Sequence, residues 1–143
     1  MDETIRRRSI NEFIQKDPFA RHLGAQVEII GPGHSRVSLT VSDEMTNFHG
    51  TTHGAVIFAL SDMAFAAASN SHGQTAVALN VGINFLKVSR SGDRLVAEAK
   101  EEFAGGRTAL YSITVRDEQT GDLVAKSQDL VYRKNDWFVK KER

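Results

Sequence analysis

The chain has 143 residues, which is typical of a single domain that buries its core without disulfides or structural metals. Its 18 basic and 18 acidic side chains balance, so the net charge favours neither nucleic acid nor an anionic membrane as a partner. The absence of cysteine excludes disulfides, thiolate metal ligands and a cysteine nucleophile. No stretch is continuous and apolar enough for a signal peptide or a membrane span, so we expect a soluble, cytoplasmic protein.

The N-terminal residues, 1–20, are predicted to form a helical extension. Apolar side chains recur at roughly helical spacing between residues 3 and 16, and Asp17-Pro18 is expected to end that pattern. Residues 25–30 and 36–41 are then predicted to be two strands around a Gly-Pro-Gly turn. Apolar and polar side chains alternate in the second of them, which indicates a β-hairpin.

The centre of the chain carries the strongest signal. A polar segment, residues 47–54, leads into an almost wholly apolar stretch that we predict to be a helix from 52 to 69, capped by Thr51 or Thr52. Because this helix is apolar on nearly every side, we expect it to be buried. Asp62 lies inside it, and burying an unpaired carboxylate costs several kcal/mol, a cost that active sites commonly accept.

Strand-like segments follow the helix and are separated by turns that contain glycine: residues 75–88, 94–103, 108–117 and 123–133. In the third of them, apolar side chains alternate with hydroxyl side chains, as in an antiparallel strand with one covered face. The central helix is the only element able to cover that face. We therefore predict an α+β fold in a single domain, residues 1–143. A curved antiparallel sheet of about five or six strands wraps around one long helix, and residues 134–143 form a charged tail.

Gly54 is predicted to lie in the first turn of the central helix, where backbone N–H groups lack an intrahelical acceptor and the helix dipole favours negative charge. Because glycine has no side chain, an acyl carbonyl can approach it and accept a hydrogen bond, which describes an oxyanion hole. The alternative is that Gly54 only relieves crowding between helix and sheet. For Asp62, the alternative to chemistry is that it caps a backbone N–H or pairs with an arginine.

Gly54 and Asp62 cannot act on one carbonyl from the same helix. Eight residues separate them by about 12 Å along the helix and by about 80° around it. A shared reacting group therefore requires two subunits with antiparallel helices, so the sequence predicts a homodimer with two composite sites. In such a site Asp62 would deprotonate a water or attack the carbonyl itself, and either route gives hydrolysis.

Asn47 and His53 are further candidates because they lie close to Gly54. Asn47 either orients the water or the acyl group through its amide, or it is an ordinary turn residue. His53 either fixes the loop or polarises the site. His49 lies four residues before His53, but a continuous helix through both is not expected and no third ligand has a defined spacing, so we predict no metal site.

Basic residues in the strand connections, among them Arg90 and Arg107, are candidates for contact with the phosphate groups of a carrier such as coenzyme A. The turn at residues 105–107 is favoured, because the bare backbone at Gly106 lets a nucleotide lie against it. The alternative for each arginine is a solvated surface position. Phe48 is a candidate for the substrate wall and equally for the core.

Several motifs carry a family resemblance. The central one is Asn47-x-x-Gly50-x-x-His53-Gly54, followed eight residues on by Asp62. Others follow the same order along nearly the whole chain: Asp17-Pro18-Phe19, Leu23-Gly24, Ala68-Ser69-Asn70, Ile83-Asn84-Phe85-Leu86 and Gly121-Asp122-Leu123-Val124-Ala125. In order and spacing this set resembles the hotdog-fold thioesterases of the phenylacetic-acid-degradation (PaaI-like) type.

The resemblance implies hydrolysis of acyl-CoA thioesters with aryl or medium-chain acyl groups, by a homodimer or by a tetramer built as a dimer of dimers. It implies no cofactor beyond the coenzyme A of the substrate. By the matching motif, Asp62 would be the catalytic base or nucleophile and Gly54 the backbone donor to the thioester carbonyl. Asn47 and His53 would position the substrate.

The chain departs from the family pattern at two places. Ala55 stands where many members have a second glycine, and because this position lies inside the helix we expect little effect. The segment 78–80 occupies a region that often supplies a hydroxyl in relatives, which leaves Asn80 as the nearest polar substitute for binding substrate. Two other functions stay open, an acyl-CoA hydratase of the same fold and a non-catalytic acyl-CoA-binding or regulatory protein.

Overall fold

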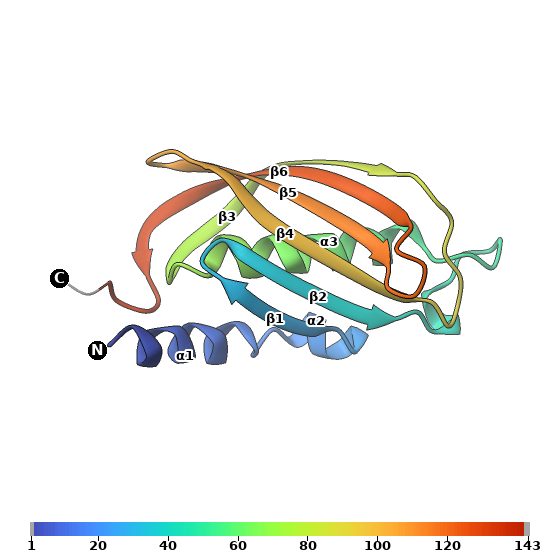
Figure 1. Ribbon diagram of the computed structural model, residues 1–143, viewed down its shortest axis with the longest axis horizontal. Coiled ribbons are helices and arrows are strands. Elements are labelled where there is room, and N and C mark those ends of the chain that lie inside the picture. Colours follow the sequence, from blue (N-terminus) through green and yellow to red (C-terminus); the bar gives the residue numbers. More distant parts are fainter. Residues whose placement is uncertain (1, 142–143) are drawn as a thin grey trace.

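A computed structural model describes residues 2–141, which form one six-stranded antiparallel sheet curved around a long helix (Figure 1). The helix is α3 (Gly54–Asn70). The strands, in their order across the sheet, are β1 (Gln26–Gly31), β2 (His34–Thr40), β4 (Arg94–Ala104), β5 (Thr108–Asp117), β6 (Leu123–Trp137) and β3 (Gln74–Phe85). Two helices, α1 (Glu3–Ile14) and α2 (Pro18–Leu23), and the short 3-10 helix η1 (Asp43–Met45) complete the fold. The predicted architecture is confirmed, with six strands.

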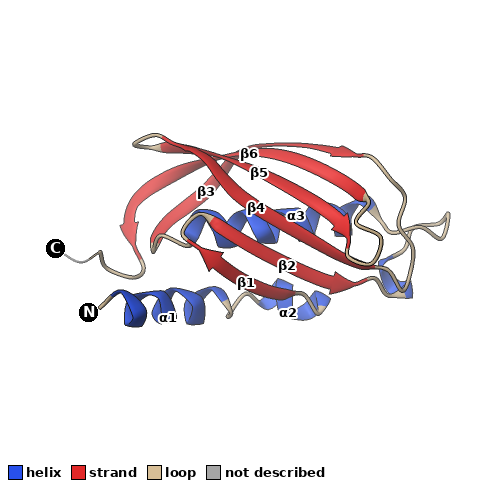
Figure 2. Cartoon of the chain, in the orientation of Figure 1, coloured by secondary structure: helices blue, strands red, loops and turns tan. Residues whose placement is uncertain are grey.

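The core forms where the inner face of the sheet meets α3 (Figure 2). In β5, every second side chain from Ala109 to Val115 is fully buried, because successive residues of a strand point to opposite faces. From the helix, Leu60, Ala64 and Ala68 are completely buried at spacings of four residues. The alternation in the strands and the helical period in α3 therefore meet in one apolar layer.

One face of α3 is open, contrary to the expectation that the helix is buried all round. Ala55, Phe58 and Ala66 are exposed, and Asp62 between them is half-buried. Their spacing of three or four residues places them along one stripe of the helix. This stripe, here called the open face of α3, has no cover within the described chain, because the sheet curves around the other sides only.

Strand β3 forms a free edge of the sheet next to β6. It is 12 residues long and exposes apolar side chains, with Val77 43%, Leu79 54% and Phe85 53% accessible to solvent. A long, apolar, unpaired edge strand is unusual in a protein that works as a monomer, because it invites pairing with another strand. The edge is therefore a surface suited to a second copy of this chain.

The N-terminal extension contains two helices where the sequence predicted one. Asp17 does not simply end the pattern: its carboxylate accepts hydrogen bonds from the backbone N–H groups of Phe19 (3.0 Å) and Ala20 (3.2 Å) and so begins α2, with Pro18 in the first turn. The central helix also begins later than predicted. Its N-cap is His53, rather than Thr51 or Thr52.

The C-terminal tail is more ordered than its charge suggested. Strand β6 continues to Trp137, beyond the predicted end at residue 133. The ring of Phe138 then stacks on that of Phe13 at 4.5 Å, and the Gly73 carbonyl accepts the Phe138 N–H. The tail thus ties α1 to the end of α3, and the last two residues of the predicted tail, 142–143, lie outside the described residues. No helix within residues 2–141 is long and apolar enough to cross a membrane.

Candidate active site on the central helix

Asp62 lies in the middle of the open face of α3. Among residues 2–141, no side chain forms a salt bridge with its carboxylate and no donor is within hydrogen-bonding distance of it. Burial raises the pKa of Asp62 above its ordinary value, and the negative charge of Asp17 raises it further. The structural alternative, an aspartate that caps a backbone N–H or pairs with an arginine, is therefore not what the described chain shows. The carboxylate is free to accept a proton or to attack a carbon.

Gly54 is the first residue of α3, and within the described chain its N–H has no acceptor. The next amide, that of Ala55, donates to Nδ1 of the His53 ring at 3.0 Å. A Cβ atom placed on Gly54 would meet only the ring of Phe85, at an ordinary contact distance of 3.7 Å. Packing within the protomer thus gives no reason for glycine here, and an amide without an acceptor in the described chain suits a ligand or a partner.

The loop before α3 is fixed by its own hydrogen bonds. Asn47 accepts the His49 N–H (2.9 Å) and its Nδ2 donates to the Thr51 hydroxyl (2.9 Å), so its contacts are those of a turn residue. Thr52 is buried and joins Ser89, whose hydroxyl lies 2.8 Å from its own. These contacts favour the turn role for Asn47, while the cap at Ala55 favours the loop-fixing role for His53.

Phe48 projects from the tip of this loop. It is 93% exposed and contacts the ring of His49, with centroids 4.4 Å apart. The core alternative is therefore wrong for Phe48, and contact with substrate or partner stays a prediction. Asn80 is also exposed, at a bulge of the edge strand β3 where the register with β6 shifts.

Arg90 and the turn at Gly106 and Arg107 lie at opposite ends of the molecule. Arg90 follows Ser89, which is bonded to the loop before α3, so it lies near the start of the helix. The Arg107 carbonyl instead accepts the Arg133 N–H (2.7 Å), and the Arg133 side chain belongs to a cluster at the other end of α3. Within one protomer these basic groups do not converge on one phosphate site.

The helix itself separates Gly54 from Asp62, as the sequence predicted. Because α3 is regular over its 17 residues, the two positions are about 12 Å apart along its axis. Two antiparallel copies that place Gly54 of one opposite Asp62 of the other have their two-fold axis beside the midpoint, Phe58. Phe58 is 39% exposed on the open face of α3, where such an axis would pass.

Two acidic residues near the site were missed in the sequence. Asp17 comes within electrostatic reach of Asp62 because α2 begins beside α3. Asp129, on β6, is completely buried, and its negative neighbour is again Asp62. The signals were present: Asp-Pro is a typical helix start, and Asp129 falls at an inward position of an alternating strand.

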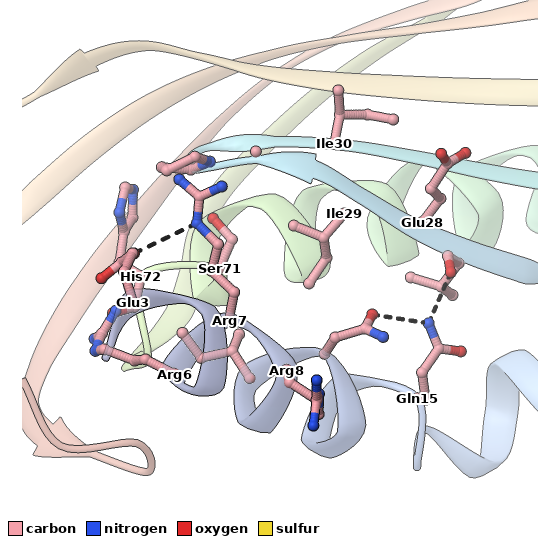
Figure 3. A pocket seen from close by; sticks show the side chains of 15 residues that line it. Glu3, Arg6, Arg7, Arg8, Gln15, Glu28, Ile29, Ile30, Ser71 and His72 are labelled. Atoms are coloured by element: carbon pink, nitrogen blue, oxygen red, sulfur yellow. Dashed lines mark hydrogen bonds and ion pairs between the residues drawn. The ribbon is translucent and has the colours of Figure 1, made fainter. Parts of the chain in front are cut away.

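A groove of the described chain lies away from this site. It has a volume of about 480 Å³ and lies between α1 and β1, where Figure 3 labels three consecutive arginines, residues 6–8, together with Ser71 and His72. Arg6 is already bonded to the His72 carbonyl, and Gln15 to that of Val27 (2.7 Å). None of the candidate site residues lines this groove. Within residues 2–141, no three His, Cys, Asp or Glu side chains come together as a metal site would require.

Comparison with known proteins decides the family. The sequence profile of the Thioesterase superfamily matches residues 49–124, a segment that contains both Gly54 and Asp62. The chain is 37% identical over 105 residues to the acyl-coenzyme A thioesterase PaaI of Escherichia coli K12, covering 73% of this chain and 75% of that protein. This chain belongs to the thioesterase superfamily.

Solved structures of similar proteins agree with the fold. The E. coli PaaI protein from the phenylacetic acid degradation operon superposes with a TM-score of 0.86 at 32% identity, covering 91% of this chain and 94% of that one. A Streptococcus mutans protein bound to acetyl-CoA gives 0.70 at 30% identity, covering 76% and 89%. The hotdog fold and the PaaI-like resemblance are thus confirmed. Because the superposition on E. coli PaaI covers 91% of this chain, it includes part of the N-terminal extension.

Proposed function

We propose that this thioesterase hydrolyses acyl-CoA thioesters with aryl or medium-chain acyl groups, in composite sites of a homodimer that pairs further into a tetramer. The observation that carries the proposal is the Asp62 carboxylate, half-buried on the open face of α3 with no partner among the described residues. The free Gly54 amide at the helix start supplies the second group that hydrolysis needs.

The chemistry balances with these two groups. Asp62 takes a proton from a water, whose oxygen forms a bond to the thioester carbon, and the carbonyl electron pair moves onto oxygen. The Gly54 N–H of the partner copy stabilises that oxyanion. When the carbonyl re-forms, the C–S bond breaks and the CoA sulfur takes the proton from Asp62. In the alternative route the Asp62 carboxylate attacks the carbon and the C–S bond breaks, which releases the CoA thiolate and leaves an anhydride. Water then hydrolyses the anhydride and supplies the proton that the thiolate takes up.

The relatives support the substrate class. The E. coli relative is named an acyl-coenzyme A thioesterase, and the S. mutans relative was solved with acetyl-CoA. The dimer is supported by the free apolar edge of β3 and by the open face of α3. In that dimer, antiparallel helices bring the Arg107 end of one copy toward the Arg90 end of the other, where both would meet the CoA phosphates.

Mixing two inactive variants tests the composite site. Asp62→Asn removes the base or nucleophile, and we expect kcat to fall by about a thousandfold. Gly54→Pro removes the N–H while keeping the helix, because proline suits the first helical position and His53 already has extended backbone (ψ 133°). We expect it to lower kcat by about a hundredfold. After subunit exchange, half of the dimers should contain one copy of each variant, and in such a heterodimer one of the two sites is intact. The mixture should therefore recover about a quarter of the parent activity.

Thiol release from acyl-CoAs is the measurement, with light scattering for assembly and Gly54→Ala as a control that retains the N–H. No recovery on mixing, with heterodimers present, would refute the shared site. Full hydrolysis by Asp62→Asn would refute the assignment of Asp62. Binding of acyl-CoA without turnover by the parent would favour the non-catalytic alternative. Label from heavy-oxygen water, followed into Asp62 in a single turnover, separates nucleophile from base.

A further inference from the structure

A second cavity adjoins the candidate site. It has a volume of about 380 Å³ and lies between the N-terminal extension and α3. Its walls come from Phe13 and Ile14 on α1 and from Met63, Ala66 and Ala67 on α3. The size is within the range of small-molecule sites. The N-terminal extension meets the functional helix at this cavity.

The cavity begins directly beside Asp62. Met63 is the next residue, and Ala66 lies one turn further along the same open face, about 6 Å along the helix axis. Asp17, which also lines the cavity, is close enough to Asp62 to raise the pKa of that carboxyl. A group bonded to a carbonyl held at Asp62 therefore reaches this cavity within a few bond lengths.

The lining is mostly apolar, and its polar side chains are Lys16, Asp17 and Asn70. Asn70 uses its amide within the protein, donating to the Ala66 carbonyl (2.9 Å) and accepting the Ala76 N–H (3.0 Å). Asp17 accepts the two N–H groups at the start of α2. Lys16 is exposed, and apolar side chains form the rest of the wall nearest Asp62, so burial of a guest's apolar surface is the main favourable contribution to binding.

The size of the neighbouring side chains narrows the guest further than charge does. Lys16 and Asp17 line the cavity with opposite charges, so charge alone does not exclude a guest that ends in a carboxylate. Ala66 and Ala67 contribute only methyl groups, which leaves width for a ring or a straight chain between α1 and α3. The cavity thus matches an apolar group of several carbons.

We propose that this cavity holds the acyl group of the substrate, so that α1 and the start of α2 form one wall of the acyl pocket and select apolar acyl chains of several carbons over short ones. The inference rests on the proposed function, since it takes the thioester carbonyl to lie at Asp62. It assigns a task to the N-terminal extension, which lies outside the segment matched by the family profile.

Filling the cavity tests the proposal. Ala66→Phe places a ring where the acyl group would lie, and because Ala66 is exposed in the protomer the change does not disturb the core. The ratio of kcat/KM for phenylacetyl-CoA to that for acetyl-CoA should fall by about tenfold or more, as expected for the loss of a hydrophobic pocket. Glu12→Phe adds the same ring on α1 at an exposed position that does not line the cavity, and it should leave the ratio unchanged.

A second variant and a binding measurement complete the test. Ile14→Ala widens the cavity from the opposite wall and should raise the ratio of kcat/KM for dodecanoyl-CoA to that for octanoyl-CoA. Because Ile14 lies on α1, this variant still tests the pocket if light scattering shows that Ala66→Phe alters the assembly. Calorimetric Kd values for phenylacetyl-CoA and acetyl-CoA in an Asp62→Asn background report on the pocket without turnover. If the parent hydrolyses nothing, the proposed function fails, and a Kd preference that Ala66→Phe abolishes still supports the pocket. Equal ratios and equal Kd preferences in all variants would overturn it.

Discussion

Two carboxyl groups in this molecule are held in opposite ways. Glu101, on β4, accepts hydrogen bonds from Tyr111 (2.6 Å) and Arg133 (2.8 Å) and contacts His72 at 3.0 Å, all through one oxygen. Asp129, on β6, is completely buried, yet only the Ser127 hydroxyl donates to it, and its second oxygen has no partner among residues 2–141.

The pKa values follow this difference. Burial alone would raise the pKa of Glu101, but the hydrogen bonds from Tyr111 and His72 and the charge of Arg133 outweigh it and lower the pKa. For Asp129, burial is the largest influence, the bond from Ser127 opposes it, and the charge of Asp62 adds to it, so the pKa rises to about 6. The Glu101 cluster fixes the end of α3 to three strands, whereas Asp62 and Asp129 form no salt bridge within residues 2–141, as is common where a protein performs chemistry.

Of the substitutions at these two carboxyl groups, Asp129→Asn should have the largest effect on stability. Because the folded-state pKa of about 6 exceeds the ordinary 3.8, folding favours the protonated form. The stability that this form gives is complete below about pH 4 and is lost as pH rises through 6, with a total of about 3 kcal/mol. Asparagine is never charged, so the variant should gain stability over the parent at pH 8 and not at pH 4. Urea unfolding at fixed protein concentration measures this, and an equal gain at both pH values would contradict it.

Glu101→Gln should have the opposite pH signature at the other end of α3. The amide keeps the size of the side chain but loses the charge to which Arg133, Tyr111 and His72 bind, which costs about 2 kcal/mol at pH 7. Since the pKa of Glu101 is lowered, its contribution is present above its unfolded pKa and is lost as pH falls through the folded one. The deficit of the variant should therefore shrink in acid.

Activity distinguishes the two ends of the helix further. Glu101 lies beyond the C-terminal end of α3, so Glu101→Gln should lower the unfolding midpoint in urea while leaving kcat at low denaturant unchanged. A loss of kcat at full folding would show that the two ends are not independent. Arg36→Gln, at an exposed salt bridge with Glu98 on the outer face, is a suitable control, because exposed pairs contribute little.

Much of the fold was predictable because periodicity is a local property. The strand at 108–117 has the predicted bounds, since its alternation of apolar and hydroxyl side chains has a single interpretation. The central helix and its acid at Asp62 followed in the same way. The open face of α3 was not predictable, because an apolar side chain looks the same in sequence whether a sheet covers it or a partner does.

The contacts that shape the site were harder to predict because they join distant segments. That Asp17 approaches Asp62 depends on how α2 packs, which no local pattern gives. The three donors around Glu101 come from a turn and two other strands, and only the register of the sheet brings them together. The inward position of Asp129 could be predicted from the alternation in β6. That no cation pairs with it among residues 2–141 could not.

His53 offers the smallest effect and decides between two roles that the sequence left open. Its Nδ1 accepts the Ala55 N–H at 3.0 Å, so His53→Ala should cost about 1 kcal/mol of stability through the lost cap. His53→Asn supplies another capping oxygen and should restore the stability. Because a loop-fixing residue acts only by holding the Gly54 amide in place, the asparagine variant should also restore kcat. If thermal unfolding shows full recovery while kcat stays low, the imidazole itself polarises the site, and the start of α3 contains two functional groups instead of one.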